Sequence, residues 1–130
     1  MAVNAVRVVG LDKLILEFDL AAAQTIAGVE AVVGRGCGNI KRDWQAAWSG
    51  FKHLNRIKYS ISYDVFTTPG HIQGEVGPDI NKTRFQGPLG GVAEFGTPTS
   101  APHPGGAPAL DAEAPRFEAA MVALTVKLLP

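Results

Sequence analysis

The segment "VVGRGCGN", residues 32–39, is the part of the sequence whose residue types and spacing come nearest to a ligand site. An apolar run precedes Gly34, Gly36 and Gly38, as in turns that hold a pyrophosphate against backbone N–H groups at a helix N-terminus. The third glycine comes one position early, however, and no acidic residue follows about twenty residues later. We therefore favour glycines inside a packed helix, and keep a small nucleotide-binding protein using the Gly34–Gly38 loop as the alternative from another functional class.

Other reactive side chains are not grouped in the sequence. The three histidines, His53, His71 and His103, lack the close spacing that places two imidazoles on one metal ion. Ser49 and His53 would meet only on a continued helix, which Gly50 interrupts, and no third residue is placed to orient the imidazole. We therefore predict a protein that is not an enzyme, with no catalytic residues, no metal ligands and no cofactor.

A long amphipathic helix is the clearest element that the sequence predicts. Apolar residues recur at intervals of three and four from Gln24 to Ser49, and Gly50 is expected to end the helix. Trp44 and Trp48 could stack on a ligand from this stripe, although aromatic residues at this spacing more commonly pack in a core. The apolar stripe comprises Ile26, Val29, Val33, Cys37, Ile40, Trp44, Trp48 and Phe51.

The same helix carries a second stripe made of small residues. Each interior glycine costs a helix about 1 kcal/mol relative to alanine, so the presence of glycines inside this helix needs a structural reason. Our hypothesis is that another backbone approaches the helix there, in a contact between subunits. The stripe consists of Ala27, Ala31, Gly34 and Gly38.

The remaining elements follow from shorter patterns. We predict a short strand at residues 6–9 and a helix over "LDKLILEFDL", residues 11–20. Alternating residues from Ile57 to Val65, a Pro-Gly turn and residues 72–76 predict an antiparallel hairpin. A C-terminal helix is expected from about Ala114, with Pro115 in its first turn, although alternation over residues 122–128 leaves a strand open.

A long loop is expected between the hairpin and the C-terminal helix, at about residues 78–108, with little regular structure apart from a short apolar piece at Leu89 to Phe95. Its segment "VAEFGTPTSAPHPGGAPAL" holds helix-breaking residues, and prolines lower the entropy lost when a loop docks on a partner. We hypothesise that Pro98, Pro102 and Pro104 contact another subunit or particle, with a solvated connector as the alternative. The predicted fold is α+β: a long helix packed on a small antiparallel sheet, an extended Pro/Gly-rich loop and a C-terminal helix.

Composition limits the classes of protein that need be considered. The 130 residues suit one domain, residues 1–130, and 46% hydrophobic with 18% charged residues predicts a folded chain. Twelve basic and twelve acidic residues cancel, so tight DNA binding is not expected. The single cysteine, Cys37, excludes an internal disulfide. Because charges interrupt the N-terminal apolar residues, we expect neither a signal peptide nor a membrane anchor.

The stretch "GVAEFGTPTSAPHPGGAPALDAEAPRF" resembles the C-terminal signature of the HK97 gp10-like family of tailed-phage neck and tail-completion proteins. Further similarity lies in a Gly-Leu-Asp helix start, in a small-residue-Gly step at Ser49 and Gly50, in a strand near Ile57 and in "EVGPD". The residues that match the family motifs are Gly10, Leu11, Asp12, Gly50, Val92, Glu94, Phe95, Gly96, Thr97, Pro104, Pro108, Ala109 and Leu110.

This resemblance implies a structural virion protein that assembles in the host cytoplasm as a ring between the head and the tail of a long-tailed phage. The implied partners are further copies of the chain, with six-fold or twelve-fold symmetry, and the neighbouring neck and tail proteins. Genome DNA would pass through the lumen without sequence-specific binding, and no membrane is involved. A tail terminator, which caps the tail tube, is the alternative within the same class.

Overall fold

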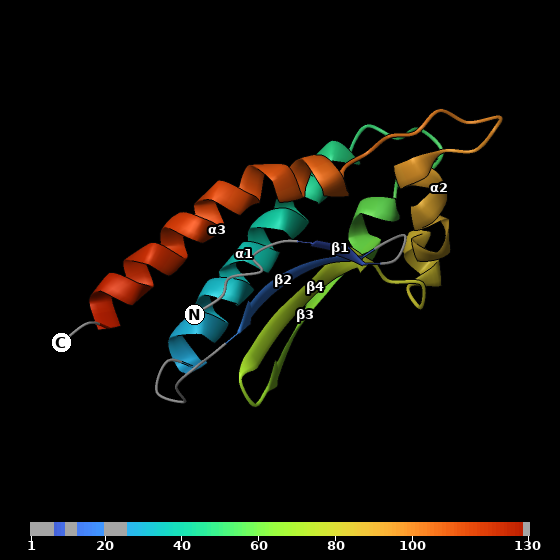
Figure 1. Cartoon of the computed structure of the whole chain (residues 1–130). Coiled ribbons are helices and arrows are strands. Elements are labelled where there is room, and N and C mark those ends of the chain that lie inside the picture. The colour runs from blue at the N-terminus through green and yellow to red at the C-terminus, as the bar shows by residue number, and fades with distance from the viewer. Residues whose placement is uncertain (1–6, 10–12, 20–25, 129–130) are drawn as a thin grey trace.

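The sheet is four-stranded and antiparallel in the part of the chain that the structure describes, with strand order β1-β2-β4-β3 (Figure 1). The structure is a computed structural model that describes residues 7–9, 13–19 and 26–128, and side chains from residue 26 to residue 127. It confirms the α+β class. The elements are β1 Arg7–Val9, β2 Lys13–Asp19, α1 Ile26–Ala47, η2 Ile57–Ser60, β3 Ile61–Thr68, β4 His71–Pro78, η3 Thr83–Phe85, η4 Gly87–Leu89, α2 Gly90–Phe95 and α3 Gly106–Leu128.

The predicted helix at residues 11–20 is wrong, because β2 occupies most of that segment. This strand lies between β1 and β4, where Leu14 pairs with Val76 and Phe18 pairs with Ile72. Leu11, Leu14, Ile15 and Phe18 fit a helical spacing, whereas Leu14, Leu16 and Phe18 alternate as in a strand. Pairing on both edges decides between the two periods. The family-motif residues 10–12 lie outside the described residues.

The predicted hairpin is confirmed as β3 and β4, joined at Pro69 and Gly70. The first strand starts later than expected, at Ile61, because residues 57–60 form the 3-10 turn η2. Within this turn the Ser60 hydroxyl donates a 2.6 Å hydrogen bond to the Ile57 carbonyl. Residues of β4 alternate between buried and half-buried, so one face of the sheet is covered and the other is more open.

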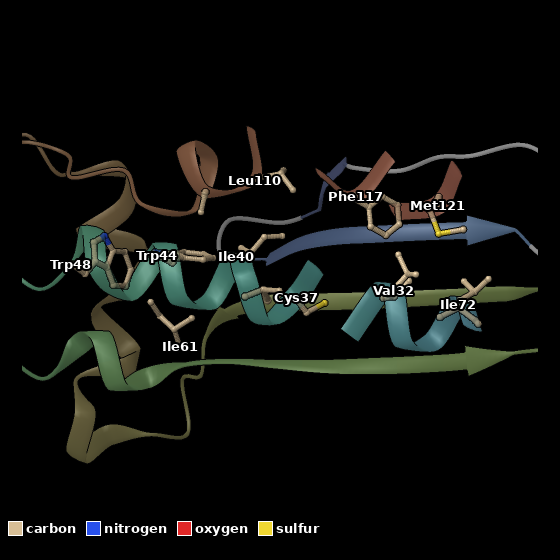
Figure 2. Packing of buried hydrophobic residues seen from close by; sticks show 14 of the residues in the cluster. Val32, Cys37, Ile40, Trp44, Trp48, Ile61, Ile72, Leu110, Phe117 and Met121 are labelled. Atoms are coloured by element: carbon tan, nitrogen blue, oxygen red, sulfur yellow. The ribbon is translucent and has the colours of Figure 1, made fainter. Parts of the chain in front are cut away.

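Helices α1 and α3 lie side by side over one face of the sheet (Figure 1). The predicted apolar stripe of α1 is confirmed as the centre of the core, although residues 48–50 form a turn beyond the helix. Figure 2 shows Cys37, Ile40 and Trp44 of α1, and Trp48 directly after it, among side chains of the sheet and of α3. The buried apolar residues are Val29, Val32, Val33, Cys37, Ile40, Trp44, Trp48, Ile57, Ile61, Ile72, Val76, Ala93, Ala109, Leu110, Phe117 and Met121.

The C-terminal helix is confirmed, but α3 begins at Gly106 and is longer than predicted. Its buried Phe117 and Met121 pack on the core, so the alternative strand is wrong. Pro115 lies inside the helix rather than in its first turn, on an exposed position. The predicted loop at 78–108 is wrong where η3, η4 and the start of α3 fall inside it, whereas α2 occupies the expected apolar piece at Leu89 to Phe95. Only residues 96–105 form an extended connection, which we call the arm.

Candidate functional site

The Gly34–Gly38 segment lies in the middle of α1, not at a helix N-terminus. Backbone N–H groups in a helix interior donate to carbonyls one turn back, so they are not free to hold a phosphate. The interpretation of these glycines as helical residues is confirmed. Gly36 is buried, whereas no atom lies within 4 Å of a Cβ placed on Gly34 or Gly38.

Among the described residues, nothing outside α1 packs over Gly34 and Gly38 of the stripe of small residues. Ala27 and Ala31 are exposed, and Gly34 and Gly38 are half-buried. Helix α3 approaches α1 on a different side, at Gly28, where an added Cβ would lie 2.8 Å from Leu124 Cδ1. A close contact between two helices is therefore present, but it lies at Gly28, which is not part of the predicted stripe.

Glu94 is the most connected residue of the family-like signature. It lies in α2 with 6% of its surface exposed, yet its carboxylate reaches the N-terminus of α3. Oε1 accepts hydrogen bonds from the backbone N–H of Gly105 at 2.9 Å and of Gly106 at 3.1 Å. Oε2 accepts from Gly106 at 3.2 Å and from Ala107 at 3.4 Å. A negative charge thus caps the positive end of α3, and Glu94 has a structural role.

Contacts of His103 with Trp48 and Ala93 attach the C-terminal part of the arm to the rest of the fold. Trp48 Nε1 donates to the His103 carbonyl at 2.8 Å, and the His103 N–H donates to the Ala93 carbonyl at 2.8 Å. The His103 ring packs edge-on against Phe51, with 4.8 Å between centroids. His103 is therefore held through its backbone and an aromatic contact.

Gly105 and Gly106 let the chain pass directly over Trp44 and Trp48, which Figure 2 shows together at one end of the core. A Cβ on Gly106 would lie 2.7 to 2.9 Å from three ring atoms of Trp44, and one on Gly105 would lie 2.7 Å from Trp44 Cδ1. Only residues without a side chain fit this approach. Trp44 and Trp48, which meet edge-to-face at 5.5 Å, pack in the core as predicted. We call Trp44, Trp48, Glu94, Gly105 and Gly106 the Glu94 cluster.

The arm itself is folded on a short internal turn. Gly96 has φ of 74°, and a Cβ there would lie 2.7 Å from Ser100 O and from Pro102 N. Thr97 and Ser100 exchange backbone hydrogen bonds of 2.8 and 3.1 Å. Pro98, Pro102 and Pro104 are exposed, as a contact role requires, and Figure 1 shows the arm projecting beyond α2 and the start of α3.

Apolar side chains surround the base of the arm. Phe95, at the end of α2, is 54% exposed, and Leu89 and Val92 are also exposed. We call these three residues the α2 patch. Two other motif residues, Pro108 and Gly50, are exposed at the start of α3 and after α1.

The structure does not assemble a reactive group from the other residues considered. The Ser49 hydroxyl donates to the Gln45 carbonyl at 2.7 Å, and His53 is exposed in the segment after α1. His71 instead contacts Gln73 in β4, with 3.2 Å between His71 Nε2 and Gln73 Oε1. Among residues 26–127 and the described strands, no group of three or more His, Cys, Asp or Glu is arranged to hold a metal ion.

A buried carboxylate that the sequence analysis missed ties α3 to α1. Glu113 accepts hydrogen bonds from Asn39 Nδ2 at 3.1 and 3.2 Å and pairs with Arg116 at 3.0 Å. Arg116 also pairs with Asp43 of α1 at 3.0 Å. The spacing of three residues between Glu113 and Arg116 could have indicated an ion pair on a helix. It could not have indicated that the Glu113 carboxylate is buried against Asn39 of α1.

Cys37 behaves as the predicted small buried residue. Burial, together with the nearby Glu113 carboxylate, raises the pKa of its thiol from 9.0 to about 12. Above about pH 9 the unfolded chain loses this proton while the folded chain keeps it, so the free energy of unfolding decreases with pH. We expect a decrease of up to about 1.4 kcal/mol per pH unit from this group. Urea unfolding between pH 8 and about pH 10.5 should show a shallower slope for Cys37→Ala; identical slopes would contradict the assignment.

The described part of the chain contains no helix that is both long enough and apolar enough to cross a membrane. Comparison of the sequence with protein-family models and with curated proteins, and of the structure with solved structures, finds no match.

Proposed function

We propose that this protein is a structural virion component of a long-tailed phage, which forms a ring in the neck and joins the head to the tail. One observation supports this proposal most directly. Residues of the family-like signature, Glu94 and Gly96 above all, fix a projecting arm in place instead of forming a reactive centre. An arm held by buried hydrogen bonds loses little entropy when it docks, which suits a permanent assembly.

A ring needs two different complementary surfaces on every subunit, because its contacts run head to tail. The arm and the α2 patch provide one surface with exposed prolines and apolar side chains. The open flank of α1, lined by Ala27, Ala31, Gly34 and Gly38, provides a second one on another element. We infer that these are the surfaces used between copies and toward neighbouring neck proteins, with genome DNA in the lumen.

The variant Gly34→Leu separates the folding of the subunit from its assembly. Because no packing atom of the described residues lies within 4 Å of a Cβ at Gly34, the monomer can accommodate the change, and leucine favours a helix over glycine by about 0.8–1 kcal/mol. We expect an unfolding free energy that is equal or higher, together with loss of ring formation. The measurements are urea unfolding and sedimentation velocity of the same preparation.

Ala46→Leu is the matched control, since Ala46 is exposed on α1 outside the stripe. It should leave both stability and assembly unchanged. Normal rings from Gly34→Leu would remove the α1 flank from the proposed interface, and an unfolded variant would contradict the open space above Gly34.

The neck position is tested by imaging virions that carry a small tag at the C-terminus. We expect one ring of tags at the junction of head and tail. A ring at the end of the tail tube would identify a tail terminator instead, and virions without the protein would refute a structural role in the particle.

A further inference from the structure

The charges of this neutral chain are segregated toward one end of the fold. Segments 51–59 and 80–86 contain five of the twelve Lys and Arg residues and no Asp or Glu, and the half-buried Asp79 directly precedes the second segment. The remaining residues therefore carry seven basic and twelve acidic side chains. The five cations are Lys52, Arg56, Lys58, Lys82 and Arg84.

Hydrogen bonds and ring packing hold these two segments together. Gln86 Oε1 accepts from the Arg56 N–H at 3.1 Å, and Gln86 Nε2 donates to the His53 carbonyl at 3.0 Å. The rings of Tyr59 and Phe85 meet edge-on at 5.9 Å. In Figure 1 both segments lie at the end of the fold where α2 is, with residues 80–86 below α2. We call segments 51–59 and 80–86 the basic end.

Gln86 keeps an unfavourable backbone conformation to make this connection. Its φ of 61° lies in the left-handed region, which a side chain rarely adopts, and it is the one such non-glycine residue in the described chain. Such strain persists where the surrounding contacts fix it, and the two bonds to the segment after α1 do so here. The basic end is thus a defined surface.

Aromatic rings lie exposed among these cations. Tyr59 is 51% exposed and Phe85 is 37% exposed, and Lys58 Nζ lies 5.2 Å from the centroid of the Tyr59 ring. Lys52, Arg56 and Arg84 are exposed to solvent. Cations with interspersed aromatic rings are the usual composition of surfaces that follow a phosphate backbone.

The carboxylates that a second copy of the chain could offer to the basic end are divided among several elements. Glu30 lies on α1, Asp64 on β3 is the register partner of Glu75 on β4, and Asp111 and Glu118 lie on α3. A nucleic acid, in contrast, presents a continuous row of negative charges that several cations can contact together.

We propose that the basic end contacts the phosphate backbone of DNA. The role of this contact in the particle rests on the proposed neck function. In that function the basic end is the part of the subunit that faces the passing genome. Five cations give a weak and salt-sensitive interaction. This agrees with a neutral chain that does not hold DNA tightly.

The test is fluorescence anisotropy of a labelled DNA duplex of about 20 base pairs, titrated with the full chain. With about four phosphate contacts, we expect the affinity to fall on the order of 10²-fold between about 50 and 200 mM salt. Arg56→Gln combined with Arg84→Gln should reduce the slope of log affinity against log salt by about 2 and weaken binding at least about tenfold at the lower salt.

The matched control is Arg35→Gln combined with Arg42→Gln, which removes the same charge from exposed positions of α1. It should retain most of the affinity and the full salt slope. Equal losses in both double variants, or no binding at low salt, would overturn the assignment. Tighter binding to labelled polyglutamate than to DNA would identify an acidic protein surface as the partner. These outcomes leave the neck proposal standing, because virion imaging tests it independently.

Discussion

Replacing Glu94 with alanine is expected to lower the free energy of unfolding by about 2–4 kcal/mol. The carboxylate accepts hydrogen bonds from three consecutive backbone N–H groups at the start of α3, and its side chain is buried. Hydrogen bonds to a charged group contribute about 1.5–3 kcal/mol, and donors left unpaired inside the protein add a desolvation cost. Urea denaturation measures the loss, and hydrogen exchange at Gly105, Gly106 and Ala107 locates it.

Two controls make this result specific. Glu94→Gln keeps one acceptor oxygen without the charge, so it should lie between the wild type and the alanine variant. Glu118→Ala removes an exposed carboxylate from α3 and should change stability by no more than about 0.5 kcal/mol. Equal effects of the Glu94 and Glu118 substitutions, or unchanged exchange at residues 105–107, would show that Glu94 does not cap α3.

The second large effect is expected from Gly106→Ala. The added methyl group would lie 2.7 to 2.9 Å from the six-membered ring of Trp44, which is buried and cannot move away freely. Overpacking of this kind costs about 1–3 kcal/mol. We expect a loss near the upper end, because the Gly106 N–H also donates hydrogen bonds to the Glu94 carboxylate. Thermal or urea unfolding measures the change.

A double-mutant cycle with Trp44→Phe identifies the cause of this loss. Phenylalanine lacks the outer ring atoms that the new methyl group would meet, so the double variant should be more stable than the sum of the single losses predicts, by about 1 kcal/mol. Gly38→Ala is the control glycine, with no atom within 4 Å, and should gain up to about 1 kcal/mol. Simple additivity of the two losses would exclude the steric explanation.

Both substitutions act on the Glu94 cluster, and both should loosen the arm before the sheet unfolds. The arm has few other attachments: the His103 backbone, the edge-on contact of its ring with Phe51, and the internal turn from Thr97 to Ser100. If the arm contacts a neighbouring subunit, a mild variant such as Glu94→Gln should assemble poorly while remaining folded. This links the stability of the cluster to the proposed role in the neck.

Local sequence patterns were sufficient to predict the elements in which the spacing of apolar residues fits either a helix or a strand but not both. The apolar stripe of α1 fits only a helix over its length, and alternation with a Pro-Gly turn fits only the β3–β4 hairpin. In the segment of β2 one set of apolar residues fits a helix and an overlapping set fits a strand, and the pairing of Leu14 with Val76 and of Phe18 with Ile72 decided for a strand. That pairing involves residues far apart in the chain, which no local window contains.

The sequence by itself also indicated the signature around Glu94 and the exposed prolines of the arm, but not what the signature does. Burial of the Glu94 carboxylate under the N-terminus of α3, and the passage of Gly105 and Gly106 over Trp44, arise only when α1, α2 and α3 pack together. The basic end likewise exists only because Gln86 joins two segments that are separate in the chain. The composition gives zero net charge for the whole chain. Only the tertiary structure determines where the positive and negative side chains lie, because folding brings together residues that are distant in the sequence.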